Sequence, residues 1–207
     1  MVLEGSRALG LSLTPAQADA LSWLAAELVR WSSRINLTAI LDPIEMADKH
    51  ILDSLAVLRG LGPGPLDLLD AGAGAGFPGL PLAIARADLS VTLVDSVAKK
   101  VGFLKHAIAR LGLAPRVRAI HRTLEGNPAK EGLGPVDVAV SRALADPARW
   151  AALARPYVRP GGTLVVMAGP DAPGAPLQGW SGPVVDRFRL PLTGDGRTLL
   201  SYRKSAA

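Results

Sequence analysis

The chain has 207 residues, of which 49% are hydrophobic and 20% charged, a composition that excludes a disordered chain and suits one globular domain. It contains no cysteine, which excludes disulfide bonds and thiolate metal sites, and its three histidines show no paired metal-ligand spacing, so no metal site is expected. The formal net charge of +5 is unevenly distributed, with −2 in residues 1–64 and +7 in residues 65–207.

The first 60 residues are predicted to be helical. Residues 14–17 (TPAQ) form a capping box with proline at the first helical position, and apolar residues then recur at helical spacing to about Ser33. Asp42 followed by proline repeats the start signal, and Gly60 stops the second pattern. We therefore expect two helices, at residues 15–33 and 43–59.

Residues 8–18 (ALGLSLTPAQA) faintly resemble the apolar segment of a signal peptide behind Arg7. Pro15 and Gln17 interrupt that segment, and the helix start explains them better. No apolar run is long and clean enough to span a membrane. We expect a cytoplasmic protein that makes no membrane contact.

After LGPGP (residues 61–65) strand patterns alternate with helix patterns. We expect strands at residues 66–70, 90–94, 116–120, 136–141 and 162–167, and helices at residues 78–86, 97–111 and 145–156 with a poor one near 124–132. Such alternation indicates a mostly parallel, doubly wound sheet. Residues 183–190 and 196–204, joined by a turn containing TGDG, predict a terminal hairpin. The Pro/Gly-rich residues 168–183 are expected to form a mobile loop at the edge of the sheet.

The segment LDLLDAGAGAGFPGLPLAIA (residues 66–85) places four glycines directly after an apolar strand. Residues 74–79 match a dinucleotide fingerprint, whereas residues 70–76 match the acid-and-glycine loop of S-adenosyl-L-methionine (AdoMet) methyltransferases. A carboxylate at Asp70 would repel pyrophosphate but suits the ammonium of a methionine moiety, and Pro78 lacks an amide that phosphate could use.

The second acid, Asp95, ends the next strand, where it can accept hydrogen bonds from both ribose hydroxyls. These residues favour AdoMet. An NAD(P)-dependent oxidoreductase and a purely structural glycine turn remain as alternatives.

The interval between Asp95 and Glu125 contains no acid. It carries seven basic residues: Lys99, Lys100, Lys105, Arg110, Arg116, Arg118 and Arg122. Such a stripe suits a polyanion such as RNA. A solvated face of an arginine-rich protein explains it equally well.

Several segments together resemble one family, the bacterial 16S ribosomal RNA guanine-N7 methyltransferases (RsmG/GidB). The matching segments are INLTAI (35–40), KHILDSLA (49–56), DAGAGAGFPGLPLAIA (70–85), VTLVDS (91–96), KKVGFLK (99–105), SRALA (141–145), RPGGTLVVM (159–167) and YRK (202–204).

The resemblance implies a class I AdoMet-dependent methyltransferase: a Rossmann-like, mostly parallel seven-stranded sheet with a C-terminal antiparallel hairpin. An N-terminal helical extension at residues 1–64 would pack on a core at residues 65–207. The enzyme would form 7-methylguanosine in the decoding-region loop of 16S rRNA (nucleotide 527 in the usual RNA numbering). Its partner would be 16S rRNA or the small ribosomal subunit, and we expect a monomer. A class I methyltransferase with another RNA or a small substrate is the alternative.

The resemblance, together with the reasoning on the two acids, assigns cofactor contacts to residues at the ends of four strands. They are Asp70, Gly72, Gly74, Gly76, Phe77, Asp95, Ser96, Thr123, Leu124 and Arg142. Phe77 could equally be a core residue, and Ser96 could equally cap the next helix. The family usually has RAEE after the third strand, whereas this chain has RTLE at residues 122–125. Thr123 and Leu124 depart from that pattern, and the contacts there are expected to be largely through the backbone. Ala168 replaces a lysine common in the family.

Arg142 ends an apolar strand on the side where parallel sheets keep their active sites, and it is the candidate catalytic residue, acting by positioning. Asn36, Lys49, His50 and Asp53 are expected to line the pocket; a local salt bridge or a helix cap is the simpler alternative. Lys99, Lys100, Lys105 and Arg122 are the candidate RNA contacts. No general base is expected, because guanine N7 keeps an in-plane lone pair.

Overall fold

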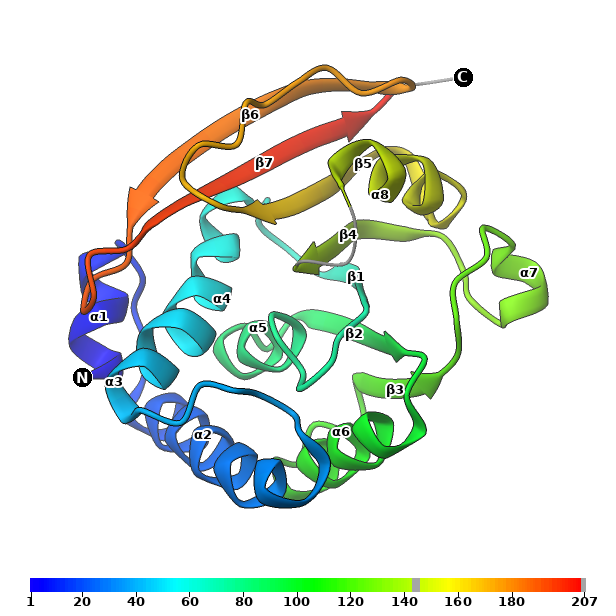
Figure 1. The fold of residues 1–207 in the computed structure, drawn as a ribbon. Coiled ribbons are helices and arrows are strands. Elements are labelled where there is room, and N and C mark those ends of the chain that lie inside the picture. The colour runs from blue at the N-terminus through cyan, green and yellow to red at the C-terminus, as the bar shows by residue number, and fades with distance from the viewer. Residues whose placement is uncertain (143–145, 206–207) are drawn as a thin grey trace.

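The computed structural model describes residues 1–142 and 146–205. Its centre is a seven-stranded sheet in the order β3-β2-β1-β4-β5-β7-β6 (Figure 1). The strands are β1 (Leu66–Ala71), β2 (Leu89–Asp95), β3 (Val117–His121), β4 (Val136–Arg142), β5 (Val158–Ala168), β6 (Trp180–Arg189) and β7 (Gly196–Lys204). Strands β1 to β5 pair in parallel, whereas β7 is antiparallel to both β5 and β6. The predicted parallel sheet with a terminal hairpin is confirmed.

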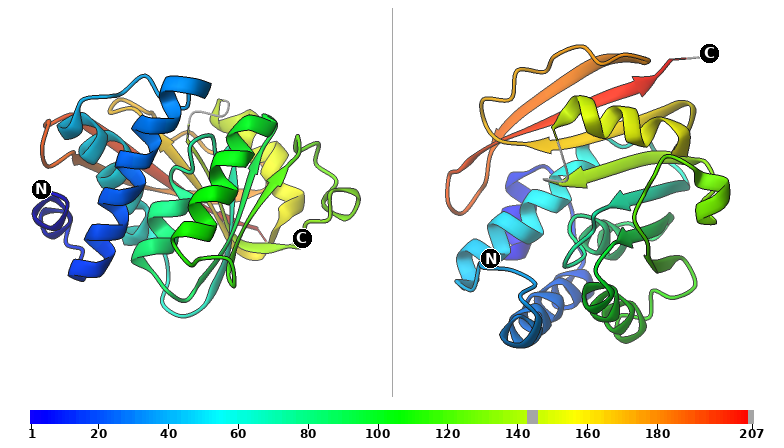
Figure 2. Two further views of the ribbon diagram at one scale, coloured as in Figure 1. Left: turned by 90° about the horizontal axis from the view of Figure 1, so that it is seen from below. Right: turned by 45° about the vertical axis from the view of Figure 1, so that its right-hand side comes forward.

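Helices cover both faces of this sheet (Figure 2). They are α5 (Gly79–Ala85), α6 (Ala98–Arg110), α7 (Pro128–Glu131) and α8 (Pro147–Ala154), the last followed by the short 3₁₀ segment η3 (Arg155–Tyr157). Helices α5 and α6 contact β2, while α8 contacts β5. The first residue predicted for α8, and the end of the SRALA segment, fall at residues 143–145, outside the described residues.

Several boundaries differ from the prediction; β5, for example, begins at Val158 instead of residue 162. The helix near 124–132 is only four residues long, because the Asn127 side chain accepts from the Lys130 amide and starts it late, leaving residues 122–126 as a loop. Strand β6 begins at Trp180, inside the predicted loop 168–183, because this indole is buried and donates to the Ala151 carbonyl.

The N-terminal part contains α1 (Val2–Ala8), which the sequence did not predict, and α2 (Pro15–Ile35). The capping box of α2 is confirmed: Thr14 Oγ1 accepts from the Gln17 amide, and the Gln17 side chain accepts from the Thr14 amide. In Figure 1, α1 lies beside the turn of the C-terminal hairpin.

Residues 43–60 are helical, as predicted, and Asp42 caps them by accepting from two amides. The prediction of one α-helix there is wrong. The segment consists of α3 (Pro43–Glu45), the π-helical η1 (Met46–Leu52), α4 (Asp53–Leu55) and the 3₁₀ segment η2 (Ala56–Gly60). A π-helical turn replaces the i→i+4 hydrogen bonds of an α-helix by i→i+5 bonds.

One hydrophobic cluster joins the N-terminal helices to the sheet face covered by α5 and α6, and includes Leu24, Leu28, Leu80 and Leu104. A second cluster, around Trp150 and the buried tyrosines, fills the opposite face under α8. None of the helices in the described part of the chain is long and apolar enough to cross a membrane.

Candidate functional site

The glycine loop after β1 is a sequence of left-handed turns. Gly72, Gly74 and Gly76 have φ values of 68°, 57° and 93°, a region that side chains other than glycine rarely adopt. A Cβ on Gly76 would also lie 2.8 Å from Leu80 Cγ. The loop therefore requires these glycines, and it leaves the backbone open between the ends of β1 and β2.

Asp70, at the end of β1, is fully buried. Its Oδ2 accepts from the Gly79 amide at 2.8 Å, while its Oδ1 has no hydrogen-bond partner among the described residues. Burial raises the pKa of the Asp70 carboxyl from 3.8 to about 7, although the bond from Gly79 and the charge of Arg142 act in the opposite direction. A buried carboxylate with a free oxygen is suited to a cationic ligand.

Asp95, at the end of β2, holds the glycine loop from the other side. Its Oδ2 accepts from the Gly74 amide and its Oδ1 from the Val97 amide, both at 2.8 Å. Each oxygen keeps a second lone pair for a ligand. The predicted capping role of Ser96 is wrong, since α6 begins after Val97 without a side-chain cap and Ser96 is exposed.

A pocket of ≈ 260 Å³ lies beside Asp95. It brings together five of the predicted cofactor residues from the ends of three strands, namely Gly72, Asp95, Ser96, Thr123 and Leu124. Val94, Arg122, Arg149 and Leu153 complete its lining. The sequence reasoning missed Arg149 and Leu153 on α8; the Asp-Pro start signal before α8 could have located Arg149 in the first turn of a helix that follows β4.

Arg142, at the end of β4, is held by the π-helical segment. Its guanidinium donates to the Lys49 carbonyl at 2.9 Å and to His50 Nδ1 at 3.1 Å. Phe77 packs against both side chains: its ring stacks on the His50 ring with centroids 4.7 Å apart, and the Arg142 guanidinium carbon lies 5.4 Å from the centroid of the Phe77 ring. Phe77 is 3% exposed and belongs to the hydrophobic core, which is the second of the two roles considered for it.

His50 is neutral at pH 7. Burial, followed by the charge of Arg142, lowers the pKa of its imidazole from 6.5 to about 4. Because Arg142 donates to Nδ1, the ring proton lies on Nε2, which then donates to Thr38 Oγ1 at 2.8 Å. Both nitrogens are engaged, so His50 orients Arg142 rather than exchanging protons with a ligand.

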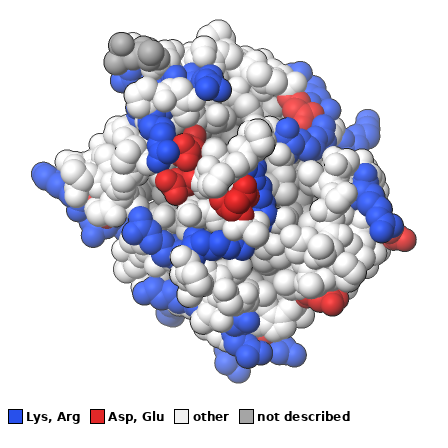
Figure 3. Space-filling model, turned by 180° about the vertical axis from the view of Figure 1, so that it is seen from behind, with Lys and Arg blue, Asp and Glu red and all other residues white. Residues whose placement is uncertain are grey.

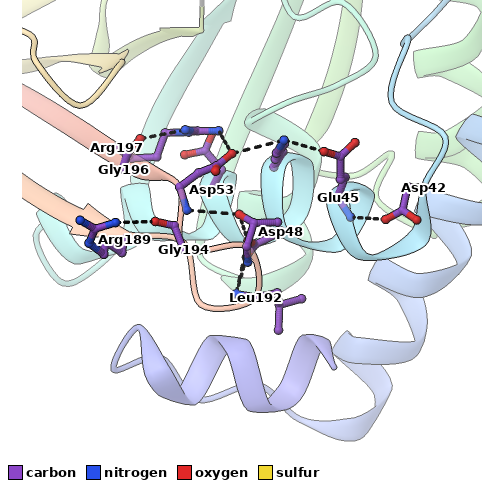
Figure 4. Close-up of polar contacts among 12 residues, drawn as sticks. Asp42, Glu45, Asp48, Asp53, Arg189, Leu192, Gly194, Gly196 and Arg197 are labelled. Atoms are coloured by element: carbon purple, nitrogen blue, oxygen red, sulfur yellow. Dashed lines mark hydrogen bonds and ion pairs between the residues drawn. The ribbon is translucent and has the colours of Figure 1, made fainter.

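The turn of the C-terminal hairpin supports the same segment (Figure 4). Asp48 is fully buried, and its carboxylate accepts from the amides of Leu192 and Thr193 and from the Thr193 hydroxyl. Asp53 forms an ion pair with Arg197 at 3.6 Å. These contacts join residues 144 or more positions apart and fix η1 beneath Arg142.

Lys49 forms a local ion pair, as the sequence allowed, but its partner is Glu45 and not Asp53. Its Nζ contacts Glu45 at 2.7 Å and Asp195 at 3.2 Å. Asn36 is exposed and ends α2 with a left-handed φ of 47°.

The predicted basic stripe is divided between two ends of the sheet. Arg116 precedes β3 and donates to the carbonyls of Ala83 and Leu89, whereas Arg122 follows β3 and lines the pocket beside Asp95. Lys99 and Lys100 occupy the first turn of α6, on the same side as Arg122, and Lys105 is exposed further along that helix.

Basic side chains also occur elsewhere on the surface. On the face in Figure 3, Lys and Arg side chains occur both near the centre and around the rim, with Asp and Glu side chains among them. Charge alone therefore does not single out one contact surface. Among the described residues, no group of three or more His, Asp or Glu side chains could hold a metal ion.

The sheet order, the hairpin, the glycine loop and the acids that end β1 and β2 define a class I AdoMet-dependent methyltransferase fold. Solved structures agree: a methyltransferase from Pyrococcus furiosus aligns with a TM-score of 0.58 at 17% identity, over 87% of this chain and 95% of that one. A predicted O-methyltransferase, protein Atu636 from Agrobacterium tumefaciens, aligns with a TM-score of 0.59 at 17% identity, over 77% and 81%.

Sequence comparison identifies the family. Residues 17–173 match the model described as "GidB: rRNA small subunit methyltransferase G". The ribosomal RNA small subunit methyltransferase G of Myxococcus xanthus is 45% identical over 206 residues, covering 97% of this chain and 94% of that protein. The protein of the same name from Anaeromyxobacter dehalogenans strain 2CP-C is 43% identical over 207 residues, covering 97% and 95%. The chain belongs to the rRNA small subunit methyltransferase G family.

Proposed function

We propose that this protein transfers the methyl group of AdoMet to N7 of a guanine in the decoding-region loop of 16S rRNA. One observation carries the proposal. The side chains of Asp70 and Asp95, at the ends of adjacent strands, flank a loop whose glycines have positive φ values. These two acids would repel a pyrophosphate group. The relatives, which are named as methyltransferases of small-subunit ribosomal RNA, indicate the substrate class.

The residues present fit AdoMet. The unpartnered, buried Oδ1 of Asp70 suits the methionine ammonium, and the free lone pairs of Asp95 suit the ribose hydroxyls. The apolar side chains of Leu124 and Leu153 suit a planar base. When bound, AdoMet supplies an electrophilic methyl group on a sulfonium.

The remaining task of the protein is alignment. Guanine N7 presents a lone pair in the plane of the base, so its attack needs no general base, and the two engaged nitrogens of His50 are consistent with that. We assign Arg142 to positioning of the target base, since its guanidinium is itself fixed by Lys49 and His50. Alignment of reactants can supply roughly 7–11 kcal/mol in favourable cases.

N7 lies on the major-groove edge of guanine, so the target base must be in a loop or unstacked to reach the site. Lys99, Lys100, Lys105 and Arg122 would hold the flanking phosphates. Asn36 and Lys49 would help to line the substrate pocket. Both belong to the N-terminal extension at residues 1–64, which packs on the core at residues 65–207. We place the monomeric enzyme in the cytoplasm, with rRNA or the small subunit as partner.

The test is methyl transfer from tritiated AdoMet to purified small-subunit rRNA and to small subunits, followed by nucleoside analysis. We expect label in 7-methylguanosine alone, at one site in the decoding-region loop. Label in another nucleoside, or only in a protein or a small molecule, would overturn the proposal.

A further inference from the structure

A buried pair, Glu131 and Tyr157, holds the loop that forms one wall of the cofactor pocket. Glu131 is 6% exposed and Tyr157 is fully buried. The tyrosine hydroxyl donates to Glu131 Oε2 at 2.6 Å. Neither residue lines the pocket, and neither has a role in the chemistry proposed above.

The two side chains bind three successive backbone amides. Glu131 Oε1 accepts from the amides of Glu125 and Asn127, at 3.1 and 2.9 Å, and the Tyr157 hydroxyl accepts from the amide of Gly126 at 2.8 Å. The loop that starts after β3 is thus anchored at its far end. Its near end is anchored by the Arg122 amide, which donates to the Asp95 carbonyl at 3.0 Å.

Between these anchors lie Thr123 and Leu124, which line the pocket with Asp95. A nucleoside whose ribose is bound by Asp95 would place its base against this loop. Residues 122–124 offer the base no carboxylate or amide side chain, so the backbone N–H and C=O groups of this loop are left, together with the Thr123 hydroxyl, to bind its ring nitrogens and amino group. Recognition by backbone requires that the backbone be fixed.

We propose that Glu131 and Tyr157 are positioning residues that fix the 122–127 loop so that its backbone recognises the adenine of AdoMet. This inference rests on the proposed function, because it takes AdoMet as the occupant of the pocket. It predicts that removal of the pair weakens binding of AdoMet. The rate of methyl transfer at saturating AdoMet should stay unchanged.

At neutral pH both side chains have the protonation states that these hydrogen bonds require. Burial favours the protonated form of Glu131, but hydrogen bonds from the Tyr157 hydroxyl and from the Asn127 and Glu125 amides outweigh it and lower the pKa of this carboxyl, so Glu131 is ionised. Burial, together with the bond to Glu131, raises the pKa of Tyr157 to about 12, so it stays protonated and donates.

The chain provides a matched control. Tyr202 is also buried in the cluster under α8, at 1% exposure, and its hydroxyl donates to the Ala175 carbonyl at 2.9 Å. Tyr202→Phe therefore removes a comparable hydroxyl bond, but one that holds the loop before β6 instead of the pocket wall.

Calorimetric titration of AdoMet and S-adenosylhomocysteine into the wild-type protein, Tyr157→Phe, Glu131→Ala, Glu131→Gln and Tyr202→Phe tests the inference. We expect Kd for both ligands to rise about tenfold or more in Glu131→Ala and about fivefold in Tyr157→Phe. Glu131→Gln keeps an acceptor for both amides and should stay within about threefold of wild type, and Tyr202→Phe within twofold.

Two further readouts separate positioning from general destabilisation. In Tyr157→Phe, hydrogen exchange should accelerate at the Gly126 amide, and KM for AdoMet should rise while kcat and KM for RNA stay within twofold. Unchanged ligand affinity in Tyr157→Phe, or an equal loss in Tyr202→Phe, would overturn the inference. Absence of AdoMet binding by the wild-type protein would instead overturn the proposed function. If Glu131→Ala does not fold, the AdoMet affinities of Tyr157→Phe and Glu131→Gln test the inference.

Discussion

Replacing Asp70 by asparagine tests the buried carboxylate of the glycine loop. In wild type its pKa is raised from 3.8 to about 7, mainly by burial. The folded protein therefore binds this proton more tightly than the unfolded chain does. Stability linked to Asp70 is present below about pH 4 and is lost as the pH rises to about 7.

The size of the effect follows from the two pKa values. A difference of one pKa unit corresponds to about 1.4 kcal/mol, so ionisation of Asp70 lowers the free energy of unfolding by about 4 kcal/mol between pH 4 and 8. The Asp70→Asn side chain would keep the acceptor for the Gly79 amide and would not ionise. Its buried amino group costs about 1–3 kcal/mol if it finds no partner.

Urea unfolding of both proteins from pH 4 to 8 measures this effect. The difference in unfolding free energy, variant minus wild type, should increase by about 4 kcal/mol across that range. The variant therefore becomes more stable relative to wild type as the pH rises. AdoMet should bind the variant at least tenfold more weakly at pH 8. A pH-independent difference, or one that decreases with pH, would refute the assignment of a raised pKa.

Three further substitutions test other parts of the account. Gly79→Ala places a Cβ against Leu93 Cδ2 and 2.8 Å from Asp70 Oδ2. In urea titrations this crowding should lower the unfolding free energy by about 1–3 kcal/mol. A variant as stable as wild type would contradict the packing argument. Arg142→Ala should retain the circular dichroism spectrum of wild type but lose methyl transfer by about 100-fold, whereas full activity would remove its positioning role. Changing Lys99, Lys100 and Lys105 together to glutamine should reduce the slope of log affinity for RNA against log salt by about 2, and an unchanged slope would mean that these lysines face only solvent.

The sheet was predictable because its strands and helices differ in hydrophobic period, and because the glycine loop and both acids come from one continuous segment. The two carboxylates could therefore be placed at adjacent strand ends without a structure. Arg142 was placed by the same logic, since it ends an apolar strand.

What the sequence did not predict depends on contacts between distant residues. The apolar spacing of residues 44–58 fits an ordinary α-helix and gives no sign of the π-helical turn, while the buried contacts of Asp48 reach the hairpin turn 144 residues away. Helix α1 is only seven residues long and too short for a periodic signal. The bond between Glu131 and Tyr157 joins residues 26 positions apart, on separate elements, and has no local signature.

Calorimetric titration of the wild-type protein with AdoMet and, separately, with NADH tests the central claim most directly. We expect AdoMet to bind at one site per chain, with affinity reduced in Asp95→Ala, and we expect NADH to give no binding heat. Binding of NADH at this site, or the absence of AdoMet binding to a folded protein, would contradict the claim that the strand-end carboxylates form a site for a sulfonium nucleoside.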